Sequence, residues 1–142
     1  MADASAAGLL DTSVVILLSR LRDPTALPGV PLISAVTLAE LSVGPLVART
    51  ETERAARQAV LQQAEADFDP LPFDDRAARA FGRVAASLRG SGRTVKARSY
   101  DAMVAAIASA NDLPLYTANP DDVAGIDGLD VRRVAVNDVP DA

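Results

Sequence analysis

The sequence predicts an α/β fold in which a short, mostly parallel sheet is covered by helices on both faces. Short apolar stretches with the length of buried strands alternate along the chain with longer stretches of helical pattern. This alternation is typical of parallel sheets, because each crossover helix covers one face of the sheet. The chain has 142 residues, 49% of them hydrophobic, which is enough for the core of one domain. We therefore expect residues 1–142 to form a single domain, with an extension over 1–7 and a flexible tail over 137–142.

The first half of the chain is predicted to contain two strands and three helices. The apolar run 8–10 forms the first strand, and Asp11, Thr12 and Ser13 after it can each cap a helix over 14–21. The elements predicted next are a loop over 23–29, a strand over 31–34, a helix over 36–43 that Gly44-Pro45 ends, and a helix over 50–66 with a capping-box pattern.

The second half is predicted to contain two helices and three strands. Apolar residues recur at helical spacing over 74–88, and the glycines of 90–92 end this helix. The helix over 101–110 is apolar nearly all round, as a buried helix should be. The strands are predicted within 68–72, over 113–116 and over 131–136, and a polar turn over 117–122 follows the second of them.

The composition excludes several classes of chemistry. There is no cysteine, so the chain forms no disulfide framework and has no thiolate nucleophile. There is no histidine either, which removes Ser-His nucleophile systems and the usual zinc ligands. Any catalysis must therefore come from carboxylates, hydroxyls, amides, arginines or the backbone.

The net charge is −5, whereas a nonspecific nucleic-acid binder is normally basic. Nearly all the cationic residues are arginine, and Lys96 is the only lysine. The charge argues less against nucleic acid if several acids are gathered at a metal site, because a bound cation reverses the local field.

The expected location is the cytoplasm. Residues 1–7 lack the basic start and the apolar core of a signal peptide. No stretch approaches the roughly 18–20 apolar residues of a membrane span. We therefore expect a soluble protein with no membrane partner.

Four acidic residues are predicted to meet at one edge of the sheet. Asp11 directly follows the first strand and Asp122 follows the strand over 113–116. Glu40 lies in the helix after the second strand, and Asp101 begins the buried helix. Ligands of such sheets collect at the carboxyl ends of the strands. Carboxylates gathered there suit Mg²⁺ or Mn²⁺, and a water activated by the metal ion can attack a phosphate.

Each of these acids also has a structural interpretation. Asp11 and Asp101 are good helix N-caps, and an acid at either place suits the helix dipole. Glu40 could lie on a solvated helix face, and Asp122 could be an ordinary turn residue. The order and spacing of all four, rather than any one of them, favour a metal site.

Four segments that contain these acids resemble the PIN-domain family, and within it the VapC type of toxin. The segments are 9–13 (LLDTS), 33–41 (ISAVTLAEL), 101–108 (DAMVAAIA) and 115–123 (LYTANPDDV), and the resemblance extends over about 8–136. It implies a three-layer α/β/α sandwich and an Mg²⁺- or Mn²⁺-dependent endoribonuclease. It further implies a homodimer that a cognate antitoxin protein inhibits.

The resemblance also implies roles for individual residues. Asp11, Glu40 and Asp101 match the central metal-site acids, and Asp122 matches the Asp of the terminal motif. Asn119 stands where some members carry an acid, so either Asn119 or Asp122 completes the site. In our hypothesis Asp11 and Asp101 hold the ion, and Glu40 acts through water or positions the nucleophile. The hydroxyls of Thr12, Ser13 and Thr117 either orient carboxylates and waters or serve as caps and turns.

Substrate and partner contacts are predicted from the basic residues. The candidates for contact with RNA phosphates are Arg20, Arg22, Arg93, Lys96 and Arg98. Such residues can equally be solvated, and 89–98 can be a loop or a surface that an antitoxin covers. An antitoxin would lay an apolar segment in a helix groove and direct an Arg or Lys toward the acids.

Three other functions stay open at this point. A nuclease of the same fold could process RNA without being a toxin, or could act on DNA. A phospho-acceptor receiver module also carries acids at strand ends, but it needs a lysine near its fifth strand, and Lys96 precedes the fourth. A non-catalytic, metal-dependent binding module is supported only by the negative charge.

Overall fold

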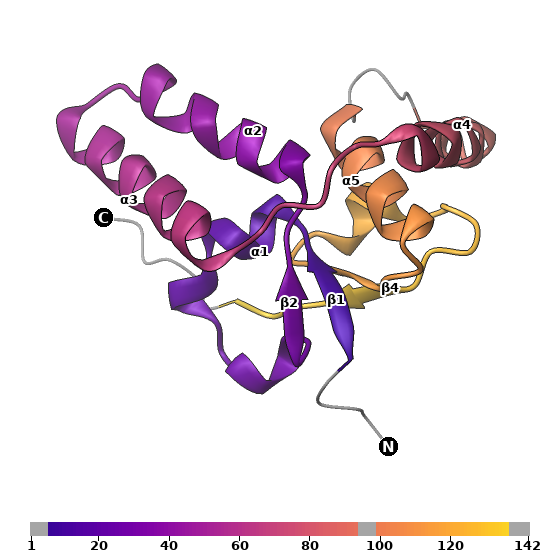
Figure 1. Cartoon of the computed structure of the whole chain (residues 1–142), viewed down its shortest axis with the longest axis horizontal. Helices are drawn as coiled ribbons and strands as arrows, with labels where there is room; N and C mark the ends of the chain where they lie inside the picture. The colour runs from indigo at the N-terminus through magenta and orange to yellow at the C-terminus, as the bar shows by residue number, and fades with distance from the viewer. Residues whose placement is uncertain (1–5, 94–98, 137–142) are drawn as a thin grey trace.

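The computed structural model describes residues 6–93 and 99–136, and its centre is a sheet of four parallel strands (Figure 1). The strands are β1 (Ala7–Leu10), β2 (Val30–Leu32), β3 (Leu115–Thr117) and β4 (Val131–Arg133). Their order in the sheet is β2-β1-β3-β4, so the chain enters at the middle and builds outward in both directions. The carboxyl ends of β1 and β3 are neighbours as a result, which brings the polar segments that follow them together.

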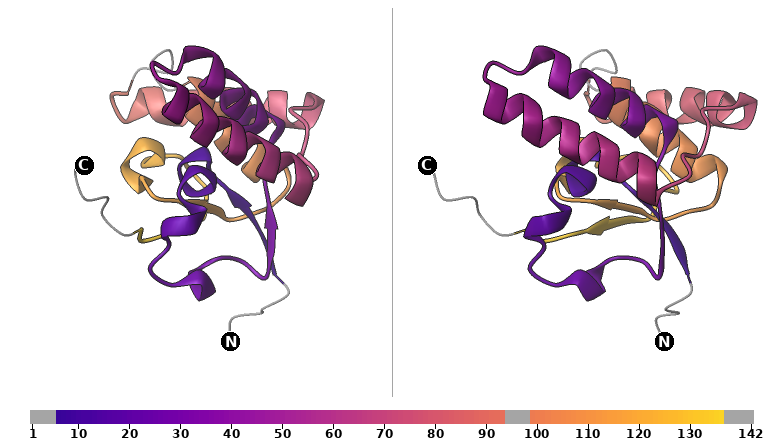
Figure 2. Two further views of the ribbon diagram at one scale, coloured as in Figure 1. Left: turned by 90° about the vertical axis from the view of Figure 1, so that its left-hand side faces the viewer. Right: turned by 60° about the vertical axis from the view of Figure 1, so that its left-hand side comes forward.

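The α-helices are α1 (Thr12–Ile16), α2 (Ala35–Val43), α3 (Glu51–Asp67), α4 (Asp75–Gly90) and α5 (Ser99–Ala110). The short 3-10 helices are η1 (Leu18–Arg20), η2 (Pro24–Ala26), η3 (Gly44–Val47) and η5 (Pro120–Val123). Side-chain oxygens of Ser34, Thr50 and Asp74 cap α2, α3 and α4, each by accepting a backbone N–H at the third helical position. Helices α2 and α3 lie side by side and extend beyond the sheet (Figure 2).

Helices cover both faces of the sheet. Successive residues of a strand point to opposite faces, so neighbouring residues pack against different helices. Leu9 and Leu115 are fully buried in a cluster with α4 and α5, whereas Leu10 and Tyr116 lie in a second cluster with α1 and α3. The predicted α/β class, with its parallel sheet and helices on both faces, is therefore confirmed.

Three elements differ most from their predicted extents. The helix predicted over 14–21 begins at Thr12, ends at Ile16 and is followed by η1. The strand predicted within 68–72 is a single bridge between Ser34 and Leu71, because Pro70 and Pro72 have no N–H with which to extend it. The strand predicted over 131–136 ends at Arg133, and Val136 instead forms an antiparallel bridge with Leu21.

The predicted ends of the chain are only partly described. Ala7 is the first residue of β1 rather than part of an extension. Residues 1–5 and the tail predicted over 137–142 lie outside the described residues. Within 6–93 and 99–136, no helix has both the length and the apolar character needed to cross a membrane.

Candidate functional site

Asp11 lies at the carboxyl end of β1, and its side chain is held by hydroxyl groups. It occupies the N-cap position of α1, yet its carboxylate accepts no capping hydrogen bond from that helix. Instead Oδ2 accepts hydrogen bonds from Ser13 Oγ at 2.8 Å and from Thr117 Oγ1 at 2.9 Å. The carboxylate is thus oriented toward the end of β3 and does not cap the helix.

The same hydroxyls organise the segment after β3. The Ala118 N–H donates to Ser13 Oγ at 3.1 Å, and the Asn119 N–H donates to Thr117 Oγ1 at 3.0 Å. Thr117 is only 1% exposed. Hydrogen bonds of Ser13 and Thr117 therefore join the loops that follow β1 and β3 around Asp11.

Glu40 extends from α2 toward the same edge and is held by Thr12, whose Oγ1 donates to Glu40 Oε1 at 2.8 Å. A hydroxyl has one proton, so at the 2.9 Å contact between Thr12 and Thr37 the donor is Thr37 Oγ1. Ser34 Oγ in turn donates to Thr37 Oγ1 at 3.3 Å. The structure thus contains a directed hydroxyl chain, Ser34–Thr37–Thr12, that ends on the Glu40 carboxylate.

Sequence reasoning missed two members of the hydroxyl chain. Ser34 and Thr37 are both fully buried. The only local signal is the position of Ser34 before a helix, where its Oγ also accepts from the Thr37 N–H at 3.0 Å. The contact between Thr37 and Thr12 joins residues 25 apart in the chain and could be found only from the fold.

The pKa of Glu40 is raised, chiefly because burial disfavours its charged form. The hydrogen bond from Thr12 opposes this shift, and the negative charge of Asp11 adds to it. Two carboxylates that repel each other in a half-buried place would both be stabilised by a cation.

Asp101 and Asp122 are placed on neighbouring elements. Asp101 is the third residue of α5 rather than its N-cap, because the helix already begins at Ser99. Asp122 lies in η5, directly after Asn119 and the end of β3. Among residues 6–93 and 99–136, no three acidic side chains are placed to hold one ion together. That Asp101 and Asp122 share a metal site with Asp11 and Glu40 therefore stays a prediction.

The donor chemistry of the pair Asp11 and Glu40 fits a hard divalent cation. Mg²⁺ prefers oxygen ligands, and proteins commonly hold it by one or two carboxylates while it keeps several waters. In the described part of the chain, no arginine forms an ion pair with either carboxylate. A bound cation would therefore offset the repulsion between these two carboxylates.

The predicted phosphate contacts are dispersed. Arg20 ends η1, and the Arg22 N–H donates to the Ala135 carbonyl at 3.4 Å, so this segment runs beside the end of β4. Arg93 follows α4. Lys96 and Arg98 lie outside the described residues.

Arg133 is a cation that the sequence analysis did not select. The last strand was predicted through Val136, which placed Arg133 in the middle of a strand rather than at its end. In the structure β4 ends at Arg133, and the residue is paired in register with Thr117.

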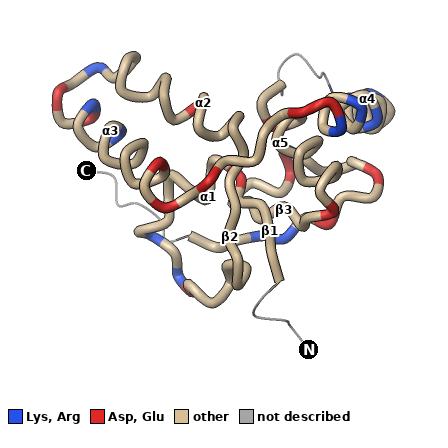
Figure 3. The backbone as a smooth tube through the Cα atoms, viewed as in Figure 1, with Lys and Arg blue, Asp and Glu red and all other residues tan. Residues whose placement is uncertain are grey.

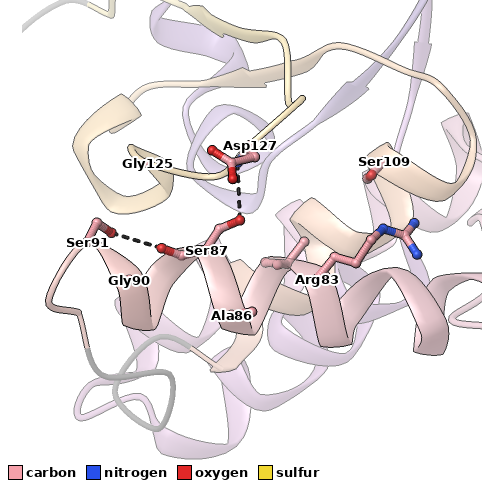
Figure 4. A pocket seen from close by; sticks show the side chains of 9 residues that line it. Arg83, Ala86, Ser87, Gly90, Ser91, Ser109, Gly125 and Asp127 are labelled. Atoms are coloured by element: carbon pink, nitrogen blue, oxygen red, sulfur yellow. Dashed lines mark hydrogen bonds between the residues drawn. The ribbon is translucent and has the colours of Figure 1, made fainter.

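Two surface depressions lie on this part of the molecule, one at the segment after β3 and the other at α4. One of about 490 Å³ is lined by Asn119, Asp121, Asp122 and Arg133, together with Ala118 and Pro120. The other, of about 680 Å³, lies among α4, the end of α5 and the loop at Gly125–Asp127 (Figure 4). It contains none of the predicted site residues, and hydrogen bonds such as that from the Asp127 N–H to Ser87 Oγ at 3.3 Å anchor its loop.

Comparison with known proteins shows the family of the chain. The model of the PIN domain matches residues 8–128. Ribonuclease VapC5 of Mycobacterium tuberculosis is 44% identical over 130 residues, which are 90% of this chain and 93% of that protein. Ribonuclease VapC1 of Rickettsia felis is 29% identical over 133 residues, which are 92% of this chain and 98% of that protein.

Solved structures show the same fold. A crystal structure of VapBC-5, a member of the VapBC family of toxin–antitoxin systems from Mycobacterium tuberculosis, matches with a TM-score of 0.78 and 44% identity, covering 92% of this chain and 99% of that one. DNA-bound VapBC from Salmonella typhimurium matches in fold, with a TM-score of 0.70 and 23% identity over 90% of this chain and 98% of that one.

Proposed function

The chain belongs to the PIN-domain family, in its VapC group of ribonuclease toxins, and from this we propose that it hydrolyses RNA phosphodiester bonds with Mg²⁺ or Mn²⁺. The observation that carries the metal requirement is the orientation of Asp11. Its carboxylate accepts no hydrogen bond from the helix terminus and is fixed by Ser13 and Thr117, and it lies near enough to Glu40 to contribute to the raised pKa of that residue.

Asp11 and Asp101 are the residues that would hold the ion, and either Asn119 or Asp122 would complete the site. The ion, when bound, would activate a water and offset negative charge on the phosphate in the transition state. Ser13 and Thr117 fix Asp11, and Thr12 fixes Glu40, so that neither carboxylate has to be ordered at the moment of reaction. Glu40 would act through water or position the nucleophile.

An antitoxin protein is the proposed regulator, and a homodimer the proposed assembly, acting in the cytoplasm. An apolar groove of about 210 Å³ between α1 and α3 supports an antitoxin that inserts an apolar segment. Its lining includes Val15, Ile16, Val60 and Phe68. Ile16 is 51% exposed, although it is a large apolar side chain.

The metal site is tested by thermal unfolding with and without metal. We expect Mn²⁺ and Mg²⁺ to raise the Tm of the wild type, because ligand binding to the folded state stabilises it. The double variant Asp11→Asn/Asp101→Asn should show no such rise. The matched control Asp67→Asn/Asp75→Asn removes the same charge at exposed helix positions and should respond as the wild type does. Equal metal-induced shifts in all three proteins would refute the site.

The activity is tested by incubating the wild type with tRNA, rRNA, mRNA and single-stranded DNA, in Mn²⁺ and in EDTA. Cleavage of RNA that EDTA abolishes supports the proposal. Cleavage of DNA alone would indicate a DNA-directed nuclease of the same fold. Binding of RNA without any cleavage in Mn²⁺ would indicate a non-catalytic module and refute the proposal.

A further inference from the structure

The end of β4 places a cation directly beside the candidate site. Arg133 is paired in register with Thr117, the residue that donates to Asp11. Neighbouring strands lie about 4.8 Å apart, so the backbone of Arg133 is one strand spacing from Thr117. Figure 3 shows a basic stretch in the sheet beside the labels of β1 and β3, and β4, which pairs with β3, carries Arg132 and Arg133.

Arg132 and Arg133 are adjacent in sequence but differ in their surroundings. Arg132 donates to Tyr116 Oη at 2.9 Å, and its guanidinium pairs with Asp130. Arg133 is exposed, and within the described residues it forms no ion pair, although Asp121 and Asp122 line the same 490 Å³ depression. A guanidinium that shares a depression with two carboxylates, and pairs with neither, keeps its donors available for another anion.

The chemistry of the depression indicates which anion this is. A carboxylate such as that of Asp121 repels a phosphodiester, so a nucleic-acid strand that binds in the depression needs positive charge close by. Arginine has a planar fork of donors that matches two phosphate oxygens. Asn119 lines the same depression and can both donate to and accept from a base or a ribose.

We propose that Arg133 binds a backbone phosphate of single-stranded RNA, in a subsite that the depression at Asn119–Asp122 forms beside the acids. This inference rests on the proposed ribonuclease function and names a residue that positions its substrate. A purely solvated Arg133 would be the alternative.

The test measures binding separately from cleavage. In an Asp11→Asn background with EDTA present, the affinity for a short fluorescein-labelled oligouridylate is measured by anisotropy over a series of KCl concentrations. One phosphate contact on a single strand contributes about 0.7 to the slope of log K against log salt. We therefore expect Arg133→Gln to lower that slope by about 0.7 and to weaken binding several-fold at low salt, and Arg133→Lys to keep most of both.

The matched control is Arg79→Gln, which removes the same charge from an exposed arginine of α4. It should leave slope and affinity unchanged. If Arg133→Gln behaves as Arg79→Gln does, or if both weaken binding equally, the subsite is refuted. Since Arg133 is exposed, its substitution should leave the Tm unchanged, which separates a loss of binding from a loss of fold.

Kinetics with Mn²⁺ separate this inference from the proposed function. We expect Arg133→Gln to raise KM for RNA while kcat changes little, since the phosphate is bound in the ground state and in the transition state alike. Cleavage by the wild type with an unchanged KM in Arg133→Gln refutes the subsite and leaves the nuclease standing. An effect of Arg133→Gln on binding, without any cleavage by the wild type, supports the subsite and refutes the nuclease.

Discussion

Thr117 Oγ1 donates a 2.9 Å hydrogen bond to Asp11 Oδ2 across 106 residues of sequence. The same oxygen accepts from the Asn119 N–H at 3.0 Å. One buried hydroxyl therefore couples the carboxylate at the end of β1 to the backbone of the loop after β3. Its importance to the site should exceed what its size suggests, because it orients a charged group that has few other partners.

Thr117→Val removes this hydroxyl and keeps the shape of the side chain. Residues that orient metal-binding side chains typically affect metal affinity or activity about 10–100-fold. We expect a loss of RNA cleavage in that range, together with about 1 kcal/mol lower stability from the lost hydrogen bonds. Thr117→Ser keeps the donor and should retain most activity. Equal activities of the Val and Ser variants in a cleavage assay would contradict an orienting role.

The hydroxyl chain on Glu40 is tested at Thr37, which touches neither the substrate nor the acids directly in our scheme. Thr37→Val removes the donor to Thr12 Oγ1 and the acceptor of the buried Ser34 hydroxyl, and a buried polar group without its partner costs about 1–3 kcal/mol. Thr37→Ser loses one buried methyl group, a loss of about 1 kcal/mol, but keeps the chain.

Both Thr37 variants should therefore lower the Tm. Only Thr37→Val should lower kcat, because only that change removes the hydrogen bond that orients Thr12, the residue that holds the Glu40 carboxylate. The measurement is kcat well below the Tm of each variant. If kcat falls in both variants in proportion to stability, Thr37 has a packing role alone.

Glu40 should lower the stability of the metal-free protein at neutral pH. Its folded pKa is raised, so between the unfolded value of 4.5 and the raised value the native state binds more protons than the unfolded state. Stability from this group is thus highest at low pH and is lost as the pH rises through that window.

We therefore expect Glu40→Gln, in EDTA, to have a higher Tm than the wild type at pH 7, with the difference shrinking as the pH approaches 4. The variant should at the same time lose RNA cleavage in Mn²⁺. Thermal melts over a pH series provide the measurement. A Tm for Glu40→Gln below that of the wild type at pH 7 would show that the carboxylate stabilises the fold.

The strands and the site differed in how far they could be predicted from sequence. Apolar runs such as Leu9-Leu10 mark β1 because burial of such residues is a local property, and the acid after each strand could be assigned to one edge by the parallel topology. The partner of a carboxylate is not a local property. Asp11 has both the identity and the position of an N-cap, and only the neighbouring β3 explains why its side chain bonds Thr117 instead.

The ends of strands were also difficult to predict from the sequence. The run from Val131 to Val136 is apolar enough to continue as a strand, but the chain leaves β3 after Arg133 to pair with the segment at Leu21. That contact joins residues far apart in sequence, so no local pattern records it. The error concealed the residue that we now propose as the phosphate contact.

Gly8 in β1 leaves no room for a larger side chain, so we expect its substitution by alanine to destabilise the fold. A Cβ built at this position would lie 2.9 Å from Tyr116 Cδ1, closer still to Cε1, and 3.0 Å from Pro28 Cβ. The ring cannot easily swing away, because it is 7% exposed and its hydroxyl is held by Arg132. Overpacking of this kind costs about 1–3 kcal/mol, which exceeds the roughly 0.4–1 kcal/mol that Gly→Ala contributes through the unfolded chain. We expect Gly8→Ala to lower the midpoint of urea unfolding.

Gly82 provides the matched control, since the same substitution there meets no obstacle. It lies within α4, and no atom approaches the built Cβ within 4 Å. Alanine in a helix interior is favoured over glycine by about 0.5–1 kcal/mol, so Gly82→Ala should raise the urea midpoint. Both substitutions add one methyl group and change the unfolded chain alike, and the m-value should stay constant in each. Shifts of the same sign would show that backbone entropy, rather than the contact with Tyr116, decides the effect at Gly8.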